Sequence, residues 1–176
     1  EGTSVQQTYD NGFIILGHTS GGPSYSDFYL IKLNYFGDTL WTRRYGGALH
    51  DIGKSVIQTS DSGYLMTGES FSFSQGDVNL YLIKTNEQGD TLWTTAYGGL
   101  DSDAGYSIVQ SYDMNYLIAG FTTSSFQNAG LCLLKINQTG DSLWTKVFDK
   151  CYLGNCIIQA KDSSIIVVGE SAGVGL

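Results

Sequence analysis

The sequence has few basic residues and no long apolar run, and each shortage excludes a class of protein. Nine lysines and arginines stand against 17 aspartates and glutamates, which gives a formal net charge of −8. A protein that binds nucleic acid needs a basic face for the phosphates, so we expect no nucleic-acid partner. No apolar stretch reaches the roughly 18 residues that a membrane-spanning helix requires, so we predict no transmembrane segment.

Groups that commonly carry catalysis or hold metal ions are also scarce. A catalytic serine or cysteine needs a neighbouring base, usually histidine, and His18 and His50 stand in no recognisable motif. We interpret both as solvated loop residues. Residues 76–79 and 101–103 offer oxygen ligands, but neither segment matches the calcium loop of an EF-hand. We therefore assign no catalytic residue, no metal site and no cofactor, and the sequence leaves the ligand unknown.

The three cysteines lack the spacing of a zinc site. Cys132 takes the place that a tyrosine has in the two preceding units of the repeat described below, so we expect it in the core. Cys151 and Cys156 lie five residues apart. They are predicted either to form a disulfide that closes a small loop, which would agree with export, or to stay as two reduced thiols.

What the sequence does contain is an internal repeat with a period of about 51 residues. Each of the three tryptophans closes the phrase Gly-Asp-Thr/Ser-Leu-Trp, at Trp41, Trp93 and Trp144. A second phrase, Gly-x-Ser-Val-x-Gln-Thr with variations, begins at four glycines: Gly2, Gly53, Gly105 and, in degraded form, Gly154. The register of both phrases predicts a single repeat domain over 1–176, with units at about 1–46, 48–98, 100–149 and an incomplete 154–176.

Each complete unit is predicted to hold four short strands. In the second unit they cover Lys54–Thr59, Gly63–Glu69, Leu80–Asn86 and Asp90–Tyr97, with no segment that indicates a helix. The third of these is apolar on both faces, which is typical of a sheet stacked between two others. Four antiparallel strands per unit favour a blade of a β-propeller over a parallel β-solenoid. The predicted fold is all-β, with about three and a half four-stranded antiparallel blades.

Most recurring residues have structural interpretations. We expect one tryptophan per blade to dock against the next blade, and the glycines at 37, 89 and 140 to serve hairpin turns. The asparagines at 34, 86 and 137 are expected to bond their own turn backbone. The lysines at 32, 84 and 135 are expected to pair with a carboxylate such as Glu69 or to extend to the rim. Asp51 and Asp103 are expected to cap the loop that enters the first strand.

Paired carboxylates are what glycoside hydrolysis or lyase chemistry would need. Four acids with suitable positions are available, although sequence fixes no distance between them: Glu69, Asp101, Asp103 and Glu170. An active site would break the symmetry of a propeller, which favours acids outside the repeat pattern. Glu87 and Asp149 meet that condition, and we interpret both as surface charges.

The repeat resembles a known family. The segments 53–59, 61–68 and 81–93 are similar to the repeats of secreted bacterial β-propeller proteins, which are common in surface and exported proteins of Bacteroidota-like bacteria. The segment from Asn86 to Trp93 is also similar to the tryptophan-docking motif of quinoprotein propellers. The resemblance to quinoprotein propellers implies a shared way of locking blades, not a shared cofactor. The resemblance to the secreted bacterial propellers covers nearly the whole chain. It implies no catalytic residue, and the pattern departs from the family around 147–164.

Closed propellers have about four to eight blades, so we expect this chain to be part of a larger propeller that further blades or another chain would close. The leading functional hypothesis is a non-catalytic extracellular or cell-surface module for scaffolding, adhesion or recognition of a protein or glycan. Twelve tyrosines favour a recognition surface. One alternative is a secreted polysaccharide-active enzyme whose site lies outside this chain. Another is a structural subunit of a surface assembly that neighbouring chains complete.

Overall fold

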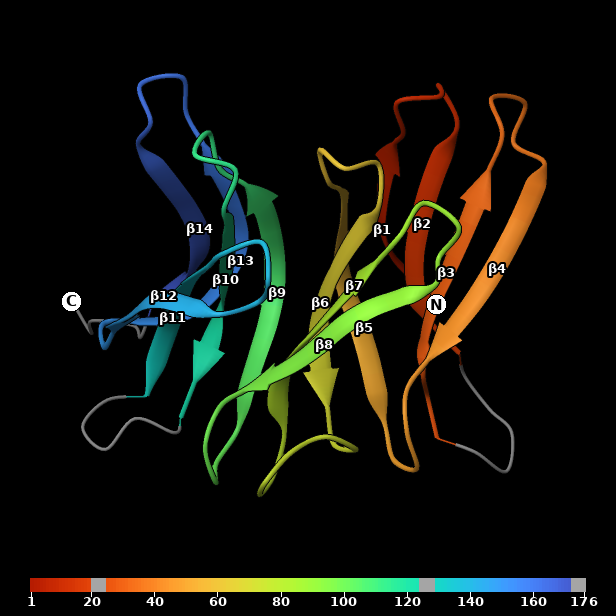
Figure 1. The fold of residues 1–176 in the computed structure, drawn as a ribbon. Coiled ribbons are helices and arrows are strands. Elements are labelled where there is room, and N and C mark those ends of the chain that lie inside the picture. Colours follow the sequence, from red (N-terminus) through yellow and green to blue (C-terminus); the bar gives the residue numbers. More distant parts are fainter. Residues whose placement is uncertain (20–24, 124–128, 172–176) are drawn as a thin grey trace.

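The structure is a computed structural model, and it describes residues 1–19, 25–123 and 129–171 (Figure 1). These residues form fourteen strands and no helix. The strands are β1 (Gly2–Gln7), β2 (Phe13–His18), β3 (Phe28–Leu33), β4 (Thr39–Tyr45), β5 (Asp51–Gln58), β6 (Tyr64–Ser70), β7 (Asn79–Thr85), β8 (Thr91–Tyr97), β9 (Asp103–Gln110), β10 (Tyr116–Thr122), β11 (Gly130–Ile136), β12 (Ser142–Phe148), β13 (Cys151–Gln159) and β14 (Ile165–Ser171).

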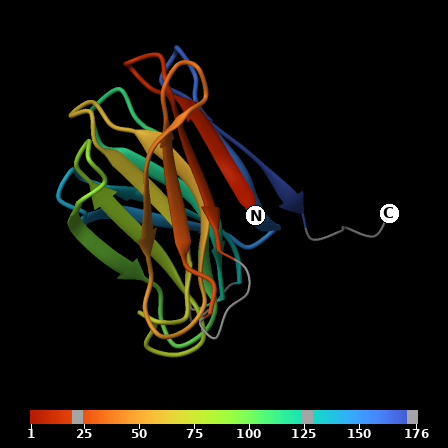
Figure 2. The ribbon, with the colours of Figure 1, turned by 90° about the vertical axis from the view of Figure 1, so that its right-hand side faces the viewer.

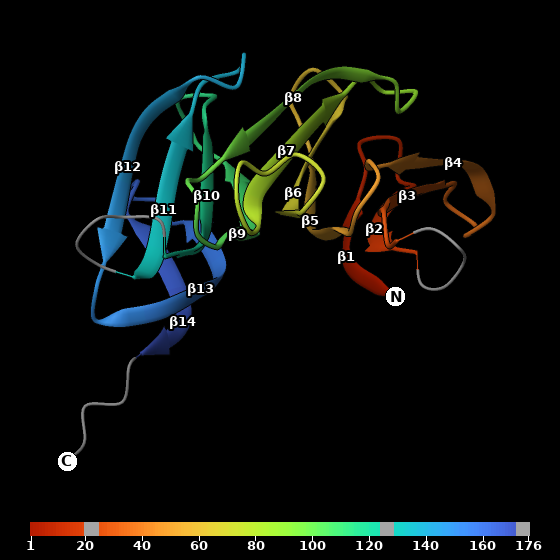
Figure 3. The same ribbon diagram turned by 90° about the horizontal axis from the view of Figure 1, so that it is seen from below.

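The predicted fold class is confirmed. Three four-stranded antiparallel sheets follow one another along the chain, and a two-stranded sheet of β13 and β14 follows them. Each sheet keeps the simple up-and-down order, so within a sheet every strand pairs with its neighbours in sequence. Figure 3 shows the sheets side by side around an arc, with β1, β5, β9 and β13 on its inner side and β4, β8 and β12 on its outer side. No described helix could span a membrane.

The hairpin turns and the longer connections gather at opposite ends of the sheets (Figure 2). In the hairpin between β5 and β6, the left-handed backbone falls on Ser62, with φ 67°, rather than on the glycine that follows. Gly63 is needed for another reason, because a Cβ there would lie 2.1 Å from the carbonyl oxygen of Thr85. In the equivalent hairpin of the first sheet the left-handed residue is Asn11, with φ 62°.

The core lies between the sheets. On β7, Tyr81 and Ile83 pack toward the first sheet, while Leu80 and Leu82 pack toward the third. All seven residues of β7 are buried, as the apolar character of both faces predicts. A third apolar cluster, which includes Leu133, joins the third sheet to the half-sheet of β13 and β14. Stacking of successive sheets is therefore the main source of burial.

Trp41 and Trp93 dock against the next sheet as expected, although their indoles are only half-buried. Trp41 lies edge-on to Tyr64 of the second sheet, with ring centroids 5.9 Å apart. The indole N–H of Trp93 donates to the carbonyl oxygen of Gln138 in the third sheet at 3.2 Å. Each docked ring lies against a turn glycine with positive φ, such as Gly89 at 82°. The predicted docking is therefore confirmed for Trp41 and Trp93.

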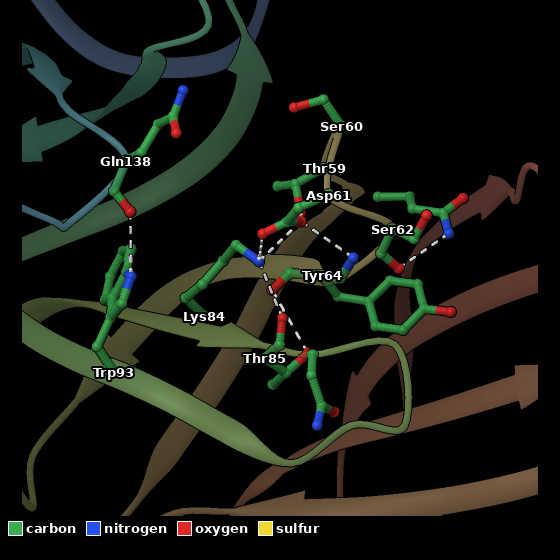
Figure 4. A network of polar contacts seen from close by, with 12 residues as sticks. Thr59, Ser60, Asp61, Ser62, Tyr64, Lys84, Thr85, Trp93 and Gln138 are labelled. Carbon is green, nitrogen blue, oxygen red and sulfur yellow. Dashed lines mark hydrogen bonds and ion pairs between the residues drawn. The ribbon is translucent and has the colours of Figure 1, made fainter.

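The repeated lysines pair with a different carboxylate from the one expected. Lys84 is almost fully buried, and its ammonium lies 2.8 Å from Asp61 in the turn between β5 and β6 (Figure 4). It also donates to the carbonyl oxygen of Thr85 at 2.9 Å. The same arrangement occurs in the other complete sheets, where the pairs are Lys32–Asp10 and Lys135–Asp113. Glu69 is not a partner of these lysines, because β6 and β7 carry Glu69 and Lys84 at opposite ends of their pairing.

Two further expectations for recurring residues are confirmed. The side-chain oxygen of Asn86 accepts from the backbone N–H groups of Gln88 and Asp90, at 3.0 and 2.8 Å. The buried carboxylate of Asp51 accepts from the backbone N–H of Gly47 at 2.7 Å and thereby ties down the connection that enters β5. These carboxylates and amides are thus used within the repeat.

A chain of glutamines, which the sequence did not predict, links the sheets along their inner strands. Each side-chain oxygen accepts a backbone N–H from the preceding sheet's hairpin turn: Gln58 from Tyr9 at 2.8 Å, Gln110 from Ser60 at 3.1 Å and Gln159 from Tyr112 at 2.8 Å. Each side-chain amide also donates to a carbonyl in its own turn. The glutamines therefore fix the height of one sheet relative to the next.

Of the three cysteines, Cys132 lies in the core, as its position in the repeat predicts. Cys132 is buried in β11, and burial raises the pKa of its thiol to about 11. Cys151 and Cys156 lie on the same strand, opposite Ser171 and Val168. Because those partners are separated by roughly 10 Å of strand, the two sulfurs cannot approach within bonding distance. Of the two alternatives for this pair, the disulfide is excluded and the reduced thiols are confirmed, so all three cysteines are free.

Substituting turn glycines tests the tryptophan docking. Gly37 and Gly89 have nearly the same φ, 89° and 82°, but a Cβ at Gly37 meets open space whereas one at Gly89 would lie 3.0 Å from the Trp41 ring. We expect Gly37→Ala to lower the free energy of unfolding by about 1 kcal/mol through backbone strain alone. Gly89→Ala should cost about 1–2 kcal/mol more. Equal losses in urea unfolding would contradict the docking.

The lysine pairs predict a second, matched comparison. Asp61→Asn leaves the buried ammonium of Lys84 without its anion, so the free energy of unfolding should fall by about 2 kcal/mol. Asp162 is the repeat equivalent in the half-sheet, and its carboxylate accepts from Ser164 instead of from a lysine. Asp162→Asn should therefore change stability by less than about 0.5 kcal/mol. Chemical denaturation of both variants measures the difference, and similar losses would refute the importance of the ion pair.

Candidate functional site

The repeat loses its symmetry at the inner ends of the first two strands of each sheet. Two positions change from sheet to sheet. One lies near the start of the first strand and holds Thr3, Lys54, Tyr106 and Asn155. The other lies near the end of the second strand and holds His18, Glu69, Phe121 and Glu170. We call the described residues that meet there the inner cluster: His18, Lys54, Glu69, Tyr106 and Phe121.

A β-bulge positions the first set. The pairing of β5 with β6 shifts register between Gly53 and Ser55, so Lys54 has no partner residue on β6. The pairing of β9 with β10 shifts at the equivalent place and leaves Tyr106 unpaired in the same way. A bulge redirects the extra side chain and increases local twist, and here Lys54 reaches Tyr106 in the next sheet.

These side chains form a continuous set of contacts across two sheets. The ammonium of Lys54 lies 3.2 Å from the carboxylate of Glu69 and 5.5 Å from the centre of the Tyr106 ring. Tyr106 in turn stacks on Phe121, with ring centroids 6.3 Å apart and planes inclined by 13°. The result is an ion pair beside a half-buried aromatic stack.

The surroundings determine the charge of each group. Burial raises the pKa of Tyr106 to about 12, and the neighbouring Glu69 carboxylate acts in the same direction, so the phenol is neutral at physiological pH. Burial also lowers the pKa of His18, and the ammonium of Lys54 is among the charges that lower it further. The buried Nδ1 of His18 has no hydrogen-bond partner in the described part of the chain. At neutral pH the inner cluster therefore presents a neutral imidazole, a neutral phenol and a compensated ion pair.

The structure places the sequence candidates in different surroundings. His18 ends β2 and is mostly buried, so its interpretation as a solvated loop residue is wrong. His50 does lie in a connection, where its Nδ1 accepts from the backbone N–H of Ser26 at 3.2 Å and Tyr25 packs edge-on against it. Its ring is exposed.

The acidic candidates do not assemble into one site. Glu69 faces Lys54, while the buried Asp103 accepts from the backbone N–H of Gly99 and from the hydroxyl of Thr122. The remaining candidates are exposed: Glu87, Asp101, Asp149 and Glu170. No three histidine, cysteine, aspartate or glutamate side chains within the described ranges converge as a metal site requires.

Sequence reasoning missed Lys54, Tyr106 and Phe121. All three occupy positions whose residue type varies among the repeats. That lack of repetition is the signal that would have found them, because residues that only build blades recur from unit to unit.

Comparison with known proteins identifies the fold and no function. No protein-family model and no curated protein sequence matches the chain. The chain is similar in structure to a protein of unknown function from Bacteroides caccae, with a TM-score of 0.61 and 9% sequence identity. The match covers 98% of this chain and 57% of that protein, so the chain spans little more than half of its structural neighbour.

The proximity of His18 to Lys54 predicts an electrostatic coupling between two sheets. Lys54→Met removes a positive charge near the imidazole, so the pKa of His18 should rise. Lys146→Met, a control on the outer strand β12, should leave it unchanged. A titration of the imidazole resonances by NMR measures both shifts, and an unchanged pKa in Lys54→Met would show that the inner cluster is not assembled as described.

Proposed function

We propose that the chain is a non-catalytic β-propeller module of an extracellular or cell-surface protein, with scaffolding and recognition as its tasks. The observation that carries this proposal is that the repeated polar side chains bond to other parts of the repeat. The repeated lysines, aspartates, asparagines and glutamines all bond within or between the blades. What remains for function is the set of residues that does not repeat.

The inner cluster supports binding better than catalysis. General acid–base chemistry needs a group that is free to exchange a proton near neutral pH. In the inner cluster, Glu69 and Lys54 form an ion pair, and the phenol of Tyr106 keeps its proton. The imidazole of His18 is the group that can accept a proton, but burial lowers its pKa and its Nε2 lies 3.6 Å from the carboxylate of Glu1. An aromatic stack beside hydrogen-bonding groups is instead the kind of surface that holds a polar ligand of low net charge.

The partner proposed is a glycan or a polar segment of a protein. The net charge of −8 disfavours polyanions, as the sequence predicts. Export and surface location are supported by the resemblance of the repeats to those of secreted bacterial propellers. The alternative of a polysaccharide-active enzyme depends on residues outside this chain, and no contact within the described residues favours it.

Binding of immobilised partners tests the proposal. The 176-residue chain should bind a defined glycan on an array, or a protein captured from the surface fraction of the source cell. Phe121→Ala should weaken that binding about tenfold or more, because it removes one face of the aromatic stack. Phe36→Ala is the matched control, since Phe36 is highly exposed in the turn between β3 and β4. No partner of either class, or equal losses in both variants, would count against recognition through the inner cluster.

A further inference from the structure

The half-sheet of β13 and β14 has apolar residues where the other sheets bury theirs. Ile166 is 47% exposed, whereas its repeat equivalents Leu65 and Leu117 are at most 1% exposed. Val168 is 64% exposed, whereas the equivalent Ala119 is fully buried. Apolar residues that the other sheets bury are therefore exposed to solvent on β14.

An apolar groove lies beside the half-sheet. It has a volume of about 430 Å3, and it is lined on one side by β11 and β12 and on the other by Cys151, Ile165 and Val167. Leu131 and Leu133 form part of its wall. At the preceding interface, the equivalents of these leucines are Leu80 and Leu82, which pack against the third sheet's own core, including Leu134 and Ile136 of its third strand.

Two further residues, one in the β13–β14 turn and one in the groove, also lack the partner that the repeat provides elsewhere. The turn aspartates of the three complete sheets each bind a lysine from the third strand. Asp162, their equivalent, accepts only from Ser164 within the described residues. Trp144 occupies the position of the docking tryptophan in the third sheet. It lines the groove, whereas Trp41 and Trp93 each pack on a turn glycine of the following sheet.

We propose that the groove and the free edge of β14 bind a β-hairpin with the sequence pattern of the repeat's third and fourth strands. Its third strand would continue the sheet beyond β14 and place two large apolar residues in the groove, as Tyr81 and Ile83 do at the interface of the first two sheets. Its lysine would reach Asp162, and its Asn-x-x-Gly-Asp turn would receive Trp144. The occupant is a further repeat unit.

The register follows from the complete sheets. Leu65 pairs with Lys84 and Met66 pairs with Ile83 between β6 and β7. The repeat equivalents of Leu65 and Met66 on β14 are Ile166 and Val167. The lysine of the incoming strand therefore lies opposite Ile166, at the distance from Asp162 that Lys84 has from Asp61.

A second copy of this chain is a poorer occupant. Each third and fourth strand pair in the described residues, for example β7 with β8, is already paired inside its own sheet. Donating such a pair would open a complete sheet and expose its core. Stacking of two copies through their terminal sheets would cover apolar area but would leave the edge of β14 and the charge of Asp162 without partners.

A synthetic peptide of residues 79–97, which carries the β7–β8 hairpin, tests the proposal in trans. With a fluorescent label, it should bind the intact 176-residue chain and raise the fluorescence anisotropy. A peptide with Ile83→Asp should bind about tenfold more weakly or worse, because it places a charge in the apolar groove. Absence of binding at millimolar chain concentration, or equal binding of both peptides, would overturn the proposal.

A charge exchange makes the test specific for the predicted register. Asp162→Lys in the chain should weaken binding of the original peptide about tenfold, and a peptide with Lys84→Asp should restore it. Because Asp162 is exposed and no lysine pairs with it among the described residues, this variant should fold normally. Failure of the exchange to restore binding would refute the register. A dimer of the chain in sedimentation that the peptide does not dissociate would show that a second copy is the occupant. None of these outcomes depends on what the inner cluster recognises.

Discussion

Burial of sheet faces against one another is the constraint on which the rest of this structure depends. A four-stranded sheet of this length cannot form a core alone, and β7, buried on both faces, exists as a stable strand only because a sheet lies on either side. The apolar clusters are accordingly shared between sheets, with Tyr81 in one and Leu82 in the other. Stability in such an array comes from each interface with a neighbour.

Apolar faces alone would not fix how the sheets sit on each other, because burial is not directional. The polar repeat residues supply that direction. The buried Lys84 holds the turn at Asp61 to the end of β7, and Gln110 then joins that turn to the next sheet. Figure 4 shows the ion pair of Lys84 with Asp61 and the bonds of the turn around it. A buried charge is costly unless it is paired, so the buried lysine of each complete unit stabilises this turn geometry.

The sequence predicts most of this fold because period, turn residues and apolar patterns all indicate the same unit. The strands of the second unit end within a few residues of the expected positions, and β5 begins earlier, at Asp51, because pairing with β6 continues through a bulge. The sequence could not choose the carboxylate that Lys84 binds. Asp61 and Glu69 both carry a carboxylate that could bind Lys84, and only the register of β6 against β7 excludes Glu69. The chance spacing of Cys151 and Cys156 was misleading for a similar reason, since an extended strand separates residues that a loop would bring together.

The candidate site was harder to predict because repetition hides it. Residues that recur are easy to see, and in this chain they build blades. Lys54 and Tyr106 occupy one bulge position in successive sheets, and their side chains meet only because the sheets stack with a fixed offset. Their contact is therefore a property of two units together, so no single repeat contains it. A bulge that turns a variable side chain toward the next blade lets the repeat change its inner surface while the core stays the same. The geometry that recurs from sheet to sheet, with Leu82 buried between sheets and Lys84 paired to the turn, thus also determines where a residue can vary and alter binding without loss of the fold.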